Sequence, residues 1–393
     1  MDDDQLPLAG LRVVEFSHMV MGPAIGVILA DLGADVTRIE PIGGDRTRHL
    51  LGSGAGYFPM YNRNKRSVCL DLKDPRGVAV AKALALGADV VIENFRPGAL
   101  DRLGLGQAAL ARDNERLIYC SAKGFLTGPY EERTALDEVA QMMGGLAYMT
   151  GPPGRPLRAG ASVIDVTGGL FGVIGILAVL ERRNRTGKGG AVKCSLFETT
   201  AFLVGQHMAQ QAVTGKAAAP MPVRISAWAI YDVFETVRPD EQVFVGVVSD
   251  GQWSSFCTLF RLDDLAADPA LALNNDRVLA RDRLLPRVRE VLGAERRDEL
   301  VAKLGAIGLP VAPIARPEDL FDDPQLAGDG LVEVTLPSGT MARLPAIPLE
   351  LDGARFGLRH DLASPGENSR ETLRALGYDD PAIDELVGAG VVE

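Results

Sequence analysis

One carboxylate, Asp165, lies at the start of a long run of small and aliphatic residues, ASVIDVTGGLFGVIGILAVL at 161–180. This run predicts a buried helix. An aspartate at a helix start is typical of an N-cap, whose carboxylate accepts backbone N–H groups. The position also suits a nucleophile that attacks a thioester, because a helix N-terminus keeps a carboxylate ionised in apolar surroundings. Gly168, Gly169 and Gly172 would let another backbone or a thin ligand come close, and spacing alone leaves both interpretations open.

A second segment with possible chemistry is ENFRPGALDRLG at 93–104. Asn94 and Phe95 follow a predicted strand, and Arg96 and Arg102 come soon after. Such residues can seat an adenine ring and bind phosphates through bidentate hydrogen bonds. A strand, a Pro-Gly turn and a surface helix would explain the segment equally well.

Positive charge is also concentrated at 62–73, NRNKRSVCLDLK, where Arg63, Lys65 and Arg66 stand close together. A cluster of this kind suits a polyphosphate. A solvated charged loop is the more usual explanation.

The sequence argues against nicotinamide and metal sites. The segment GADVTRIE at 33–40 ends in an acid, as in dinucleotide folds, but the preceding turn SHMVMGPAIG lacks GxGxxG. The four cysteines are far apart and suit reduced core residues, and the four histidines show no paired ligand spacing. These residues are Cys69, Cys120, Cys194, Cys257, His18, His49, His207 and His360.

Strand-like and helix-like segments alternate in the first part of the chain, which predicts a parallel sheet flanked by helices. Its loops follow strand ends, where open α/β sheets bind ligands. The expected strands are 11–16, 34–39, 67–70, 89–92 and 117–120, with helices at 24–32 and 75–86 between them. A Pro- and Ala-rich bridge at 215–222 predicts a linker to a smaller α/β lobe.

Composition and net charge indicate the class of protein and the partners that the charge disfavours. The 393 residues are 47% hydrophobic and carry a net charge of -11, which is typical of a globular protein and unfavourable for nucleic acid or anionic membrane. The acidic start, MDDDQLPLAG, does not resemble a signal peptide, so we expect a cytoplasmic protein.

Taken in order, these segments resemble the family III CoA transferases, the group that includes formyl-CoA transferase, carnitine CoA transferase and alpha-methylacyl-CoA racemase. The resemblance extends over nearly the whole chain. The matching segments are PLAGLRVVEFSHMVMGP, GADVTRIEP, NKRSVCLDLK, ENFRPGALDRLG, DEVAQMMGGLAYMTG, ASVIDVTGGLFGVIGILAVLERRNRTGKGG and SPGENSRETLRALGY.

The resemblance implies an α/β fold with a large Rossmann-like lobe containing a parallel sheet, a smaller α/β lobe, and an interlocked homodimer. We expect 1–214 to form the first part of the large CoA-binding domain and 215–325 to form the small domain with its flanking linkers. The return segment 326–393 then completes the large domain.

The family's nucleophile corresponds to Asp165, which the resemblance therefore implies is catalytic. Further positions correspond to CoA contacts, and four of them lie beside the thioester. The CoA-binding positions are Val20, Met21, Leu70, Asp71, Lys73, Asn94, Phe95, Arg96, Arg102 and, beside the thioester, Thr134, Ala135, Leu136 and Asp137.

The implied reaction moves CoA from an acyl-CoA donor to a small carboxylic acid, through an aspartyl acyl anhydride and an aspartyl-CoA thioester. CoA is then a co-substrate, and no metal or other cofactor is expected. The alternatives are a noncatalytic CoA-binding protein and an acyl-CoA racemase or epimerase that exchanges the alpha proton.

Two departures from the family pattern bear on this choice. The racemases place a catalytic histidine where this chain has Leu136, and racemisation needs a base on each face of the alpha carbon. The tetraglycine loop of the formyl-CoA type is replaced by PVRISAWAIYDVF, which predicts a different pair of acids. Arginines that could recognise a second carboxylate of the substrate are Arg46, Arg48, Arg155, Arg158 and Arg224.

Overall fold

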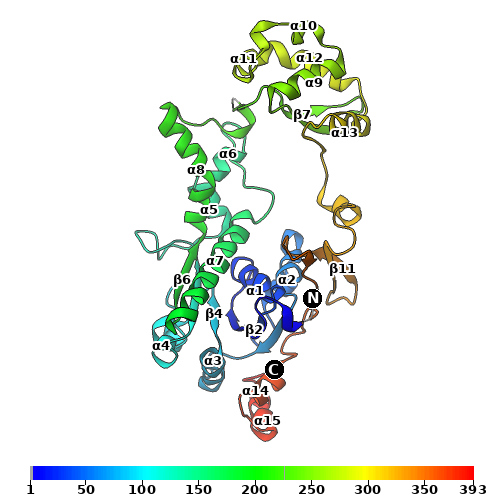
Figure 1. Cartoon of the computed structure of the whole chain (residues 1–393). Coiled ribbons are helices and arrows are strands. Elements are labelled where there is room, and N and C mark those ends of the chain that lie inside the picture. Colours follow the sequence, from blue (N-terminus) through cyan, green and yellow to red (C-terminus); the bar gives the residue numbers. More distant parts are fainter. Residues whose placement is uncertain (1–2, 225) are drawn as a thin grey trace. The chain divides into compact units, whose positions relative to one another are not determined.

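The computed structural model describes residues 3–224 and 226–393, and the chain divides into two compact units (Figure 1). One unit comprises Met1–Pro222 and Pro324–Glu393, and the other comprises Val223–Asp323. Each unit has a hydrophobic core of its own. The assignment of CoA binding to the larger unit stays a prediction.

The larger unit is built on a six-stranded parallel sheet with the order β3-β2-β1-β4-β5-β6. The strands are β1 (Arg12–Phe16), β2 (Asp35–Glu40), β3 (Lys65–Cys69), β4 (Val90–Glu93), β5 (Ile118–Lys123) and β6 (Gly190–Ser195). The chain winds outward from the centre in both directions, so the loops after β1 and β4 diverge at the carboxyl edge, where such sheets bind ligands. The predicted parallel sheet is confirmed.

Helices cover both faces of this sheet (Figure 1). On one face, Val13 of β1 packs with Ile25 of α1 and Ile176 of α7. On the other face, Val14 of β1 packs with the helices α3, α4, α14 and α15, so the end of the chain completes the core. The helices of this unit are α1 (Met21–Asp31), α2 (Tyr57–Tyr61), α3 (Pro75–Gly87), α4 (Gln107–Asp113), α5 (Asp137–Met143), α6 (Leu146–Thr150), α7 (Val163–Thr186), α8 (Leu196–Thr214), α14 (Ser369–Ala375) and α15 (Asp380–Gly388).

Glycines of α7 let this helix approach α1 closely. A Cβ atom on Gly169 would lie 3.2 Å from the carbonyl oxygen of Met21, and one on Gly172 would lie 2.6 Å from Cδ1 of Ile25. The sequence left open a close backbone or a thin ligand at these glycines, and the structure shows the close backbone.

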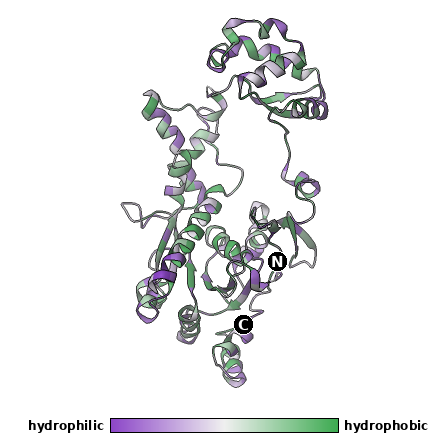
Figure 2. Ribbon diagram, viewed as in Figure 1, coloured by the Kyte–Doolittle hydropathy of each residue, from purple (hydrophilic) through white to green (hydrophobic). Residues whose placement is uncertain are grey.

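The outer side of α7 is exposed in the single chain, so the prediction of a buried helix holds only for its inner side. Leu170 and Ile174 are 44% and 59% exposed, although Figure 2 shows hydrophobic residues along the helix. Among the described residues, α7 is the one helix whose length and composition would suffice to cross a membrane, a test that core helices of soluble proteins also pass. Among the described residues, the sheet and the helices α1, α5 and α8 contact α7 but leave its outer apolar side chains exposed.

The smaller unit is a three-stranded antiparallel sheet packed with helices around Trp253 and Phe256. Its elements are β7 (Tyr231–Glu235), β8 (Gln242–Gly246), β9 (Val311–Pro313), α9 (Asp250–Phe260), α10 (Asp263–Ala266), α11 (Asn274–Leu279), α12 (Arg281–Gly293) and α13 (Arg297–Ala306). The return segment of the larger unit adds the paired strands β10 (Leu331–Thr335) and β11 (Met341–Pro345), and β12 (Glu350–Leu351) and β13 (Ala354–Arg355).

Charged side chains are buried beneath the loop that follows β1. Oε1 of Glu15 accepts a hydrogen bond from Nη1 of Arg38 at 3.1 Å, and Oε2 accepts one from Nζ of Lys65 at 2.8 Å. Asn62 Oδ1 accepts from Arg38 at 2.7 Å. These side chains are almost fully inaccessible to solvent, so each charge depends on its partner.

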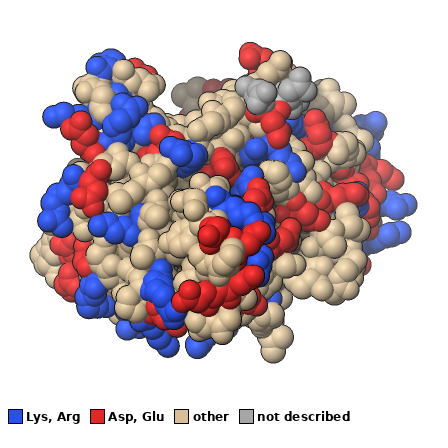
Figure 3. Space-filling model, turned by 90° about the horizontal axis from the view of Figure 1, so that it is seen from below, with Lys and Arg blue, Asp and Glu red and all other residues tan. Residues whose placement is uncertain are grey.

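This network corrects both interpretations of the basic segment 62–73. Lys65 binds Glu15, and Nη2 of Arg63 binds Asp31 at 2.6 Å, so neither cation is available to a phosphate or lies in a solvated loop. Of Arg63, Lys65 and Arg66, only Arg66 reaches the surface, where it pairs with Asp35 and Glu371. Charges of both signs are interspersed on the face shown in Figure 3.

Replacing Glu15 by Gln should destabilise the protein strongly, because buried Lys65 would lose its ion-pair partner, whereas Arg38 keeps Asp45. We expect a loss of about 3–5 kcal/mol in the free energy of unfolding, measured by urea denaturation. Arg66→Ala is the matched control, since Arg66 pairs at the surface and should change the free energy of unfolding by about 0–1 kcal/mol. Equal small losses for the two variants would contradict this account.

Candidate active site

The loops after β1 and β4 are joined at the centre of the sheet edge. Asn94 Nδ2 donates to the carbonyl oxygen of His18 at 2.8 Å, and Asn94 Oδ1 accepts from the His18 backbone N–H at 3.0 Å. The rings of His18 and Phe95 stack with their centroids 5.5 Å apart. Val20 and Met21 follow directly and are buried at the start of α1. The structure therefore brings the predicted residues of these two loops together.

Three predicted cations lie at the same edge with exposed side chains. Lys73 follows β3, Arg96 follows β4, and Arg102 lies in a 3-10 turn at Asp101–Leu103 and not in the surface helix of the alternative interpretation. None of the three forms an ion pair within the described part of the chain. They are therefore free to bind an anionic ligand, unlike Arg63 and Lys65.

The other predicted positions after β3 belong to the packing of the C-terminus. Leu70 is buried and forms a β-bridge with Val392. Asp71 accepts a hydrogen bond from the backbone N–H of Lys73 at 2.9 Å, and its own N–H donates to the carbonyl oxygen of Val391.

Asp165 is the third residue of α7, and it is not the N-cap that the sequence suggested. Ser162 occupies the N-cap position without a side-chain cap. The carboxylate of Asp137 caps the helix instead, because its Oδ2 accepts from the N–H groups of Ile164 at 3.0 Å and Asp165 at 3.2 Å. Within residues 3–224 and 226–393 no hydrogen bond to the Asp165 carboxylate is present, so this half-buried group remains available for chemistry.

Asp137 is held on its other side as well. Gln141 donates to Oδ1 of Asp137, and Oε1 of Gln141 accepts from the N–H of Ala159 at 2.8 Å. Nη2 of Arg158 lies 3.5 Å from the same Oδ1. Asp137 therefore connects α5, the segment before α7, and the first turn of α7.

Burial of Asp165, followed by the negative charges of Asp137 and Glu138, raises the pKa of its carboxyl to about 7, although Arg158 acts in the opposite direction. The expectation that the helix terminus keeps this carboxylate ionised is thus wrong below neutral pH. Sequence reasoning missed a neighbour, Tyr61 of α2, whose pKa is raised by burial and by the charge of Asp165. Its position 104 residues earlier gave no signal, because Tyr61 comes within electrostatic range of Asp165 only in the fold.

The remaining predicted positions precede α5. Thr134 and Leu136 have exposed side chains, and Ala135 packs against Gly124, where an added Cβ would come within 2.5 Å. They are continuous with Asp137 and so lie at the same end of the site as Asp165.

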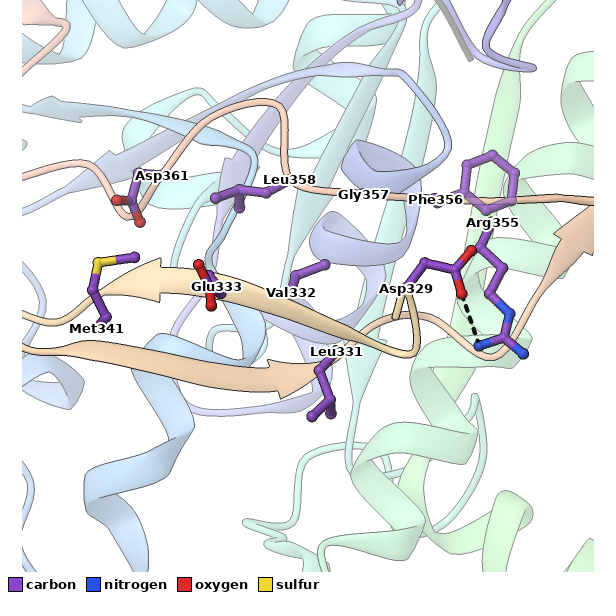
Figure 4. A pocket seen from close by; sticks show the side chains of 10 residues that line it. All are labelled: Asp329, Leu331, Val332, Glu333, Met341, Arg355, Phe356, Gly357, Leu358 and Asp361. Carbon is purple, nitrogen blue, oxygen red and sulfur yellow. Dashed lines mark ion pairs between the residues drawn. The ribbon is translucent and has the colours of Figure 1, made fainter. Parts of the chain in front are cut away.

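A cavity of about 510 Å³ lies elsewhere in the larger unit, between the β10–β11 hairpin and the segment 355–361 (Figure 4). Its lining combines apolar side chains with acids, and Arg355 pairs there with Asp329 at 3.3 Å. None of the predicted site residues lines this cavity.

The described ranges contain no group of three or more His, Cys, Asp or Glu side chains placed to bind a metal ion. All four cysteines are buried and free, as expected for core residues.

Comparisons with known proteins agree with this arrangement. The sequence model described as CoA-transferase family III matches residues 8–368. The chain is 32% identical to succinyl-CoA:glutarate CoA-transferase of Mus musculus, over 100% of this chain and 91% of that protein. It is 35% identical to acetyl-CoA:oxalate CoA-transferase of Acetobacter aceti, over 88% of this chain and 90% of that protein.

A solved structure extends the likeness to the fold. A CAIB/BAIF family protein from Brucella suis is 34% identical, with a TM-score of 0.81 over 94% of this chain and 99% of that one. Because the family match covers most of the sequence and the relatives are aligned over nearly their full length, the resemblance seen in the sequence is confirmed. The chain therefore belongs to CoA-transferase family III and is a CoA-transferase.

Proposed function

We propose that this CoA-transferase uses Asp165 as a covalent nucleophile to move CoA between two small carboxylic acids. The observation that supports this most directly is a carboxylate that is half-buried, has no hydrogen bond within the described residues, and stands beside a separately capped helix terminus. A structural N-cap would have its oxygens occupied by backbone N–H groups.

In the first half of the reaction, a carboxylate oxygen of Asp165 attacks the thioester carbonyl carbon of the donor. The carbon–sulfur bond breaks, CoA leaves as a thiolate, and an aspartyl acyl anhydride forms. The thiolate then attacks the aspartyl carbonyl, which releases the donor acid and leaves an aspartyl-CoA thioester.

The second half reverses these steps with the acceptor acid. Its carboxylate attacks the aspartyl-CoA thioester, giving a new anhydride and CoA thiolate. The thiolate then attacks the acyl carbonyl of the acceptor, which yields the new acyl-CoA and regenerates Asp165. No electron leaves or enters at any step.

The N–H groups at the start of α7 already have acceptors, so they do not supply an oxyanion hole. Those of Ile164 and Asp165 donate to Asp137, and that of Val166 donates to Ser162. Stabilisation of the tetrahedral intermediates therefore falls to other donors, and the hydroxyl of Tyr61 is the nearby candidate.

CoA binding at the carboxyl edge of the sheet is supported by the exposed cations Lys73, Arg96 and Arg102, which would neutralise phosphate groups. The stacked rings of His18 and Phe95 offer an aromatic surface to the adenine.

Relatives with the names succinyl-CoA:glutarate and acetyl-CoA:oxalate CoA-transferase act on dicarboxylic acids. We therefore take a short dicarboxylic acid as one substrate. The racemase alternative has less support, because the exposed apolar side chain of Leu136 cannot transfer a proton.

A homodimer would cover the apolar surface of α7 and α8. Exposed apolar patches of this kind mark protein interfaces in soluble proteins. The exposed side chains are Leu170, Ile174, Leu177, Phe202, Leu203 and Met208.

Replacing Ile174 by Glu should weaken the homodimer, because a charge would be buried at the interface. Sedimentation over a range of concentrations should show a smaller species than the unmodified protein, while Glu181→Ala, in the polar last turns of the same helix, should sediment normally. An unmodified protein that sediments as a monomer would refute the homodimer.

Replacing Asp165 by Ala should lower transfer by at least about 1,000-fold, because the covalent route is lost. Binding of CoA, measured by calorimetry, should change little. Full turnover by the variant would overturn the proposed function.

Transfer should also depend on pH. The pKa of Asp165 is raised to about 7, so the protonated, unreactive form dominates below that pH and kcat/KM should fall about tenfold per unit on further acidification. Replacing Asp137 by Asn removes a negative charge that raises this pKa, so the fall should move to lower pH. Glu181→Gln should leave the profile unchanged, and an unshifted profile for the Asp137 variant would contradict this electrostatic account.

A further inference from the structure

Five arginines could recognise a second carboxylate of the substrate, and the fold separates them. Arg48 is engaged by Glu40, with its Nε and Nη2 at 2.8 and 2.6 Å from the two carboxylate oxygens. Arg224 belongs to the smaller unit. Arg46 and Arg155 are exposed, and neither is among the charges that shift the pKa of Asp165.

The remaining arginine, Arg158, lies beside the nucleophile. Its Nη2 is 3.5 Å from one oxygen of the Asp137 carboxylate, and the other oxygen accepts the N–H of Asp165 at 3.2 Å. The guanidinium and the nucleophilic residue therefore border the same carboxylate from its two sides. Arg158 is also the cation whose charge lowers the pKa of Asp165.

One edge of the Arg158 guanidinium has no good partner. Nη1 donates to Oε1 of Glu138 at 2.6 Å, but Nε is buried and has no acceptor among the described residues. Nη2 has only the contact with Oδ1 of Asp137, at 3.5 Å. The edge formed by Nε and Nη2 is the one that matches the two oxygens of a carboxylate, and a buried donor without an acceptor is costly.

The negative charges around Asp165 explain why a substrate carboxylate would need a cation at this site. Asp137, Glu138 and Asp165 place three carboxyl groups around a single arginine. A substrate that brings a further carboxylate into this site would be repelled unless a cation met it directly. The side chain of Arg158 is 32% exposed, so an incoming acid can reach the guanidinium, but it must displace a neighbouring group to meet Nε, which is itself buried.

We infer that the Nε–Nη2 edge of Arg158 binds the distal carboxylate of a short dicarboxylic acyl group while its thioester faces Asp165. This inference rests on the proposed function and adds to it the residue that selects diacids over monoacids. Glu138 keeps Nη1 and fixes the guanidinium plane.

The test compares succinyl-CoA with butyryl-CoA, which have the same chain length and differ in the distal carboxylate. The first-turnover release of CoA thiol is followed by stopped flow with a thiol reagent that traps it, so no acceptor is required. Measurement at pH 8.5 keeps Asp165 ionised, so that a change in its pKa does not affect the comparison.

We expect unmodified enzyme to release CoA faster from succinyl-CoA. Arg158→Gln should slow release from succinyl-CoA by about 10- to 100-fold, as for a lost charge-assisted bidentate pair, and leave butyryl-CoA nearly unchanged. Arg158→Lys should release CoA from succinyl-CoA at a rate between those of the unmodified enzyme and Arg158→Gln. Lysine keeps the positive charge but cannot donate two parallel hydrogen bonds to a carboxylate. Arg155→Gln, in the same segment, should behave as the unmodified enzyme.

The experiment distinguishes a failure of the role inferred for Arg158 from a failure of the proposed function. Loss of both reactions in equal measure on Arg158→Gln, or no loss of either, overturns the role of Arg158 while the transferase mechanism stands. Thiol release that survives in Asp165→Ala, or that is absent from the unmodified enzyme with both thioesters, overturns the proposed function itself.

Discussion

The site depends on one carboxylate that does not react. Asp137 accepts the first free N–H groups of α7 and so performs the capping that Asp165 would otherwise provide. Because Asp137 caps the helix, Asp165 lies in the first turn with no hydrogen bond from the described residues to its carboxylate oxygens. Burial, together with the same negative charge, raises the pKa of Asp165 to about 7, so Asp137 contributes to both the geometry and the protonation of the proposed nucleophile.

The sheet places Asp165 near the loops proposed to bind CoA. Because the strand order reverses between β1 and β4, the loops after these strands meet at the carboxyl edge, where Asn94 joins them. The glycines of α7 bring its first turns against α1, which begins at the end of the β1 loop. Close helix packing thus carries the start of α7 to the same edge of the sheet, and the buried pairs of Glu15 support the loop from beneath.

Much of this could be predicted from sequence. Apolar runs separated by helical spacing predicted the strands of the sheet within a few residues, because buried parallel strands are continuously hydrophobic. Family motifs predicted Asp165 as the nucleophile and the cations at the sheet edge as CoA contacts, and these roles stay predictions. The roles of Lys65 and Arg63 could not be predicted, because their partners Glu15 and Asp31 lie in other elements and charge runs are usually solvated. The capping of α7 by Asp137 could not be predicted either, because Asp137 precedes the N–H group of Ile164 by 27 residues and the two meet only in the folded chain. The exposed side of α7 was missed because composition alone does not separate a core helix from one with a bare apolar face.

The most direct test of the covalent role of Asp165 is mass spectrometry of protein quenched during turnover in the presence of hydroxylamine. An aspartyl thioester or anhydride at Asp165 would be captured as a hydroxamate, so the peptide that contains Asp165 should gain the corresponding mass only when acyl-CoA is present. An unmodified Asp165 peptide from enzyme that is turning over, or a hydroxamate on a different residue, would contradict the account.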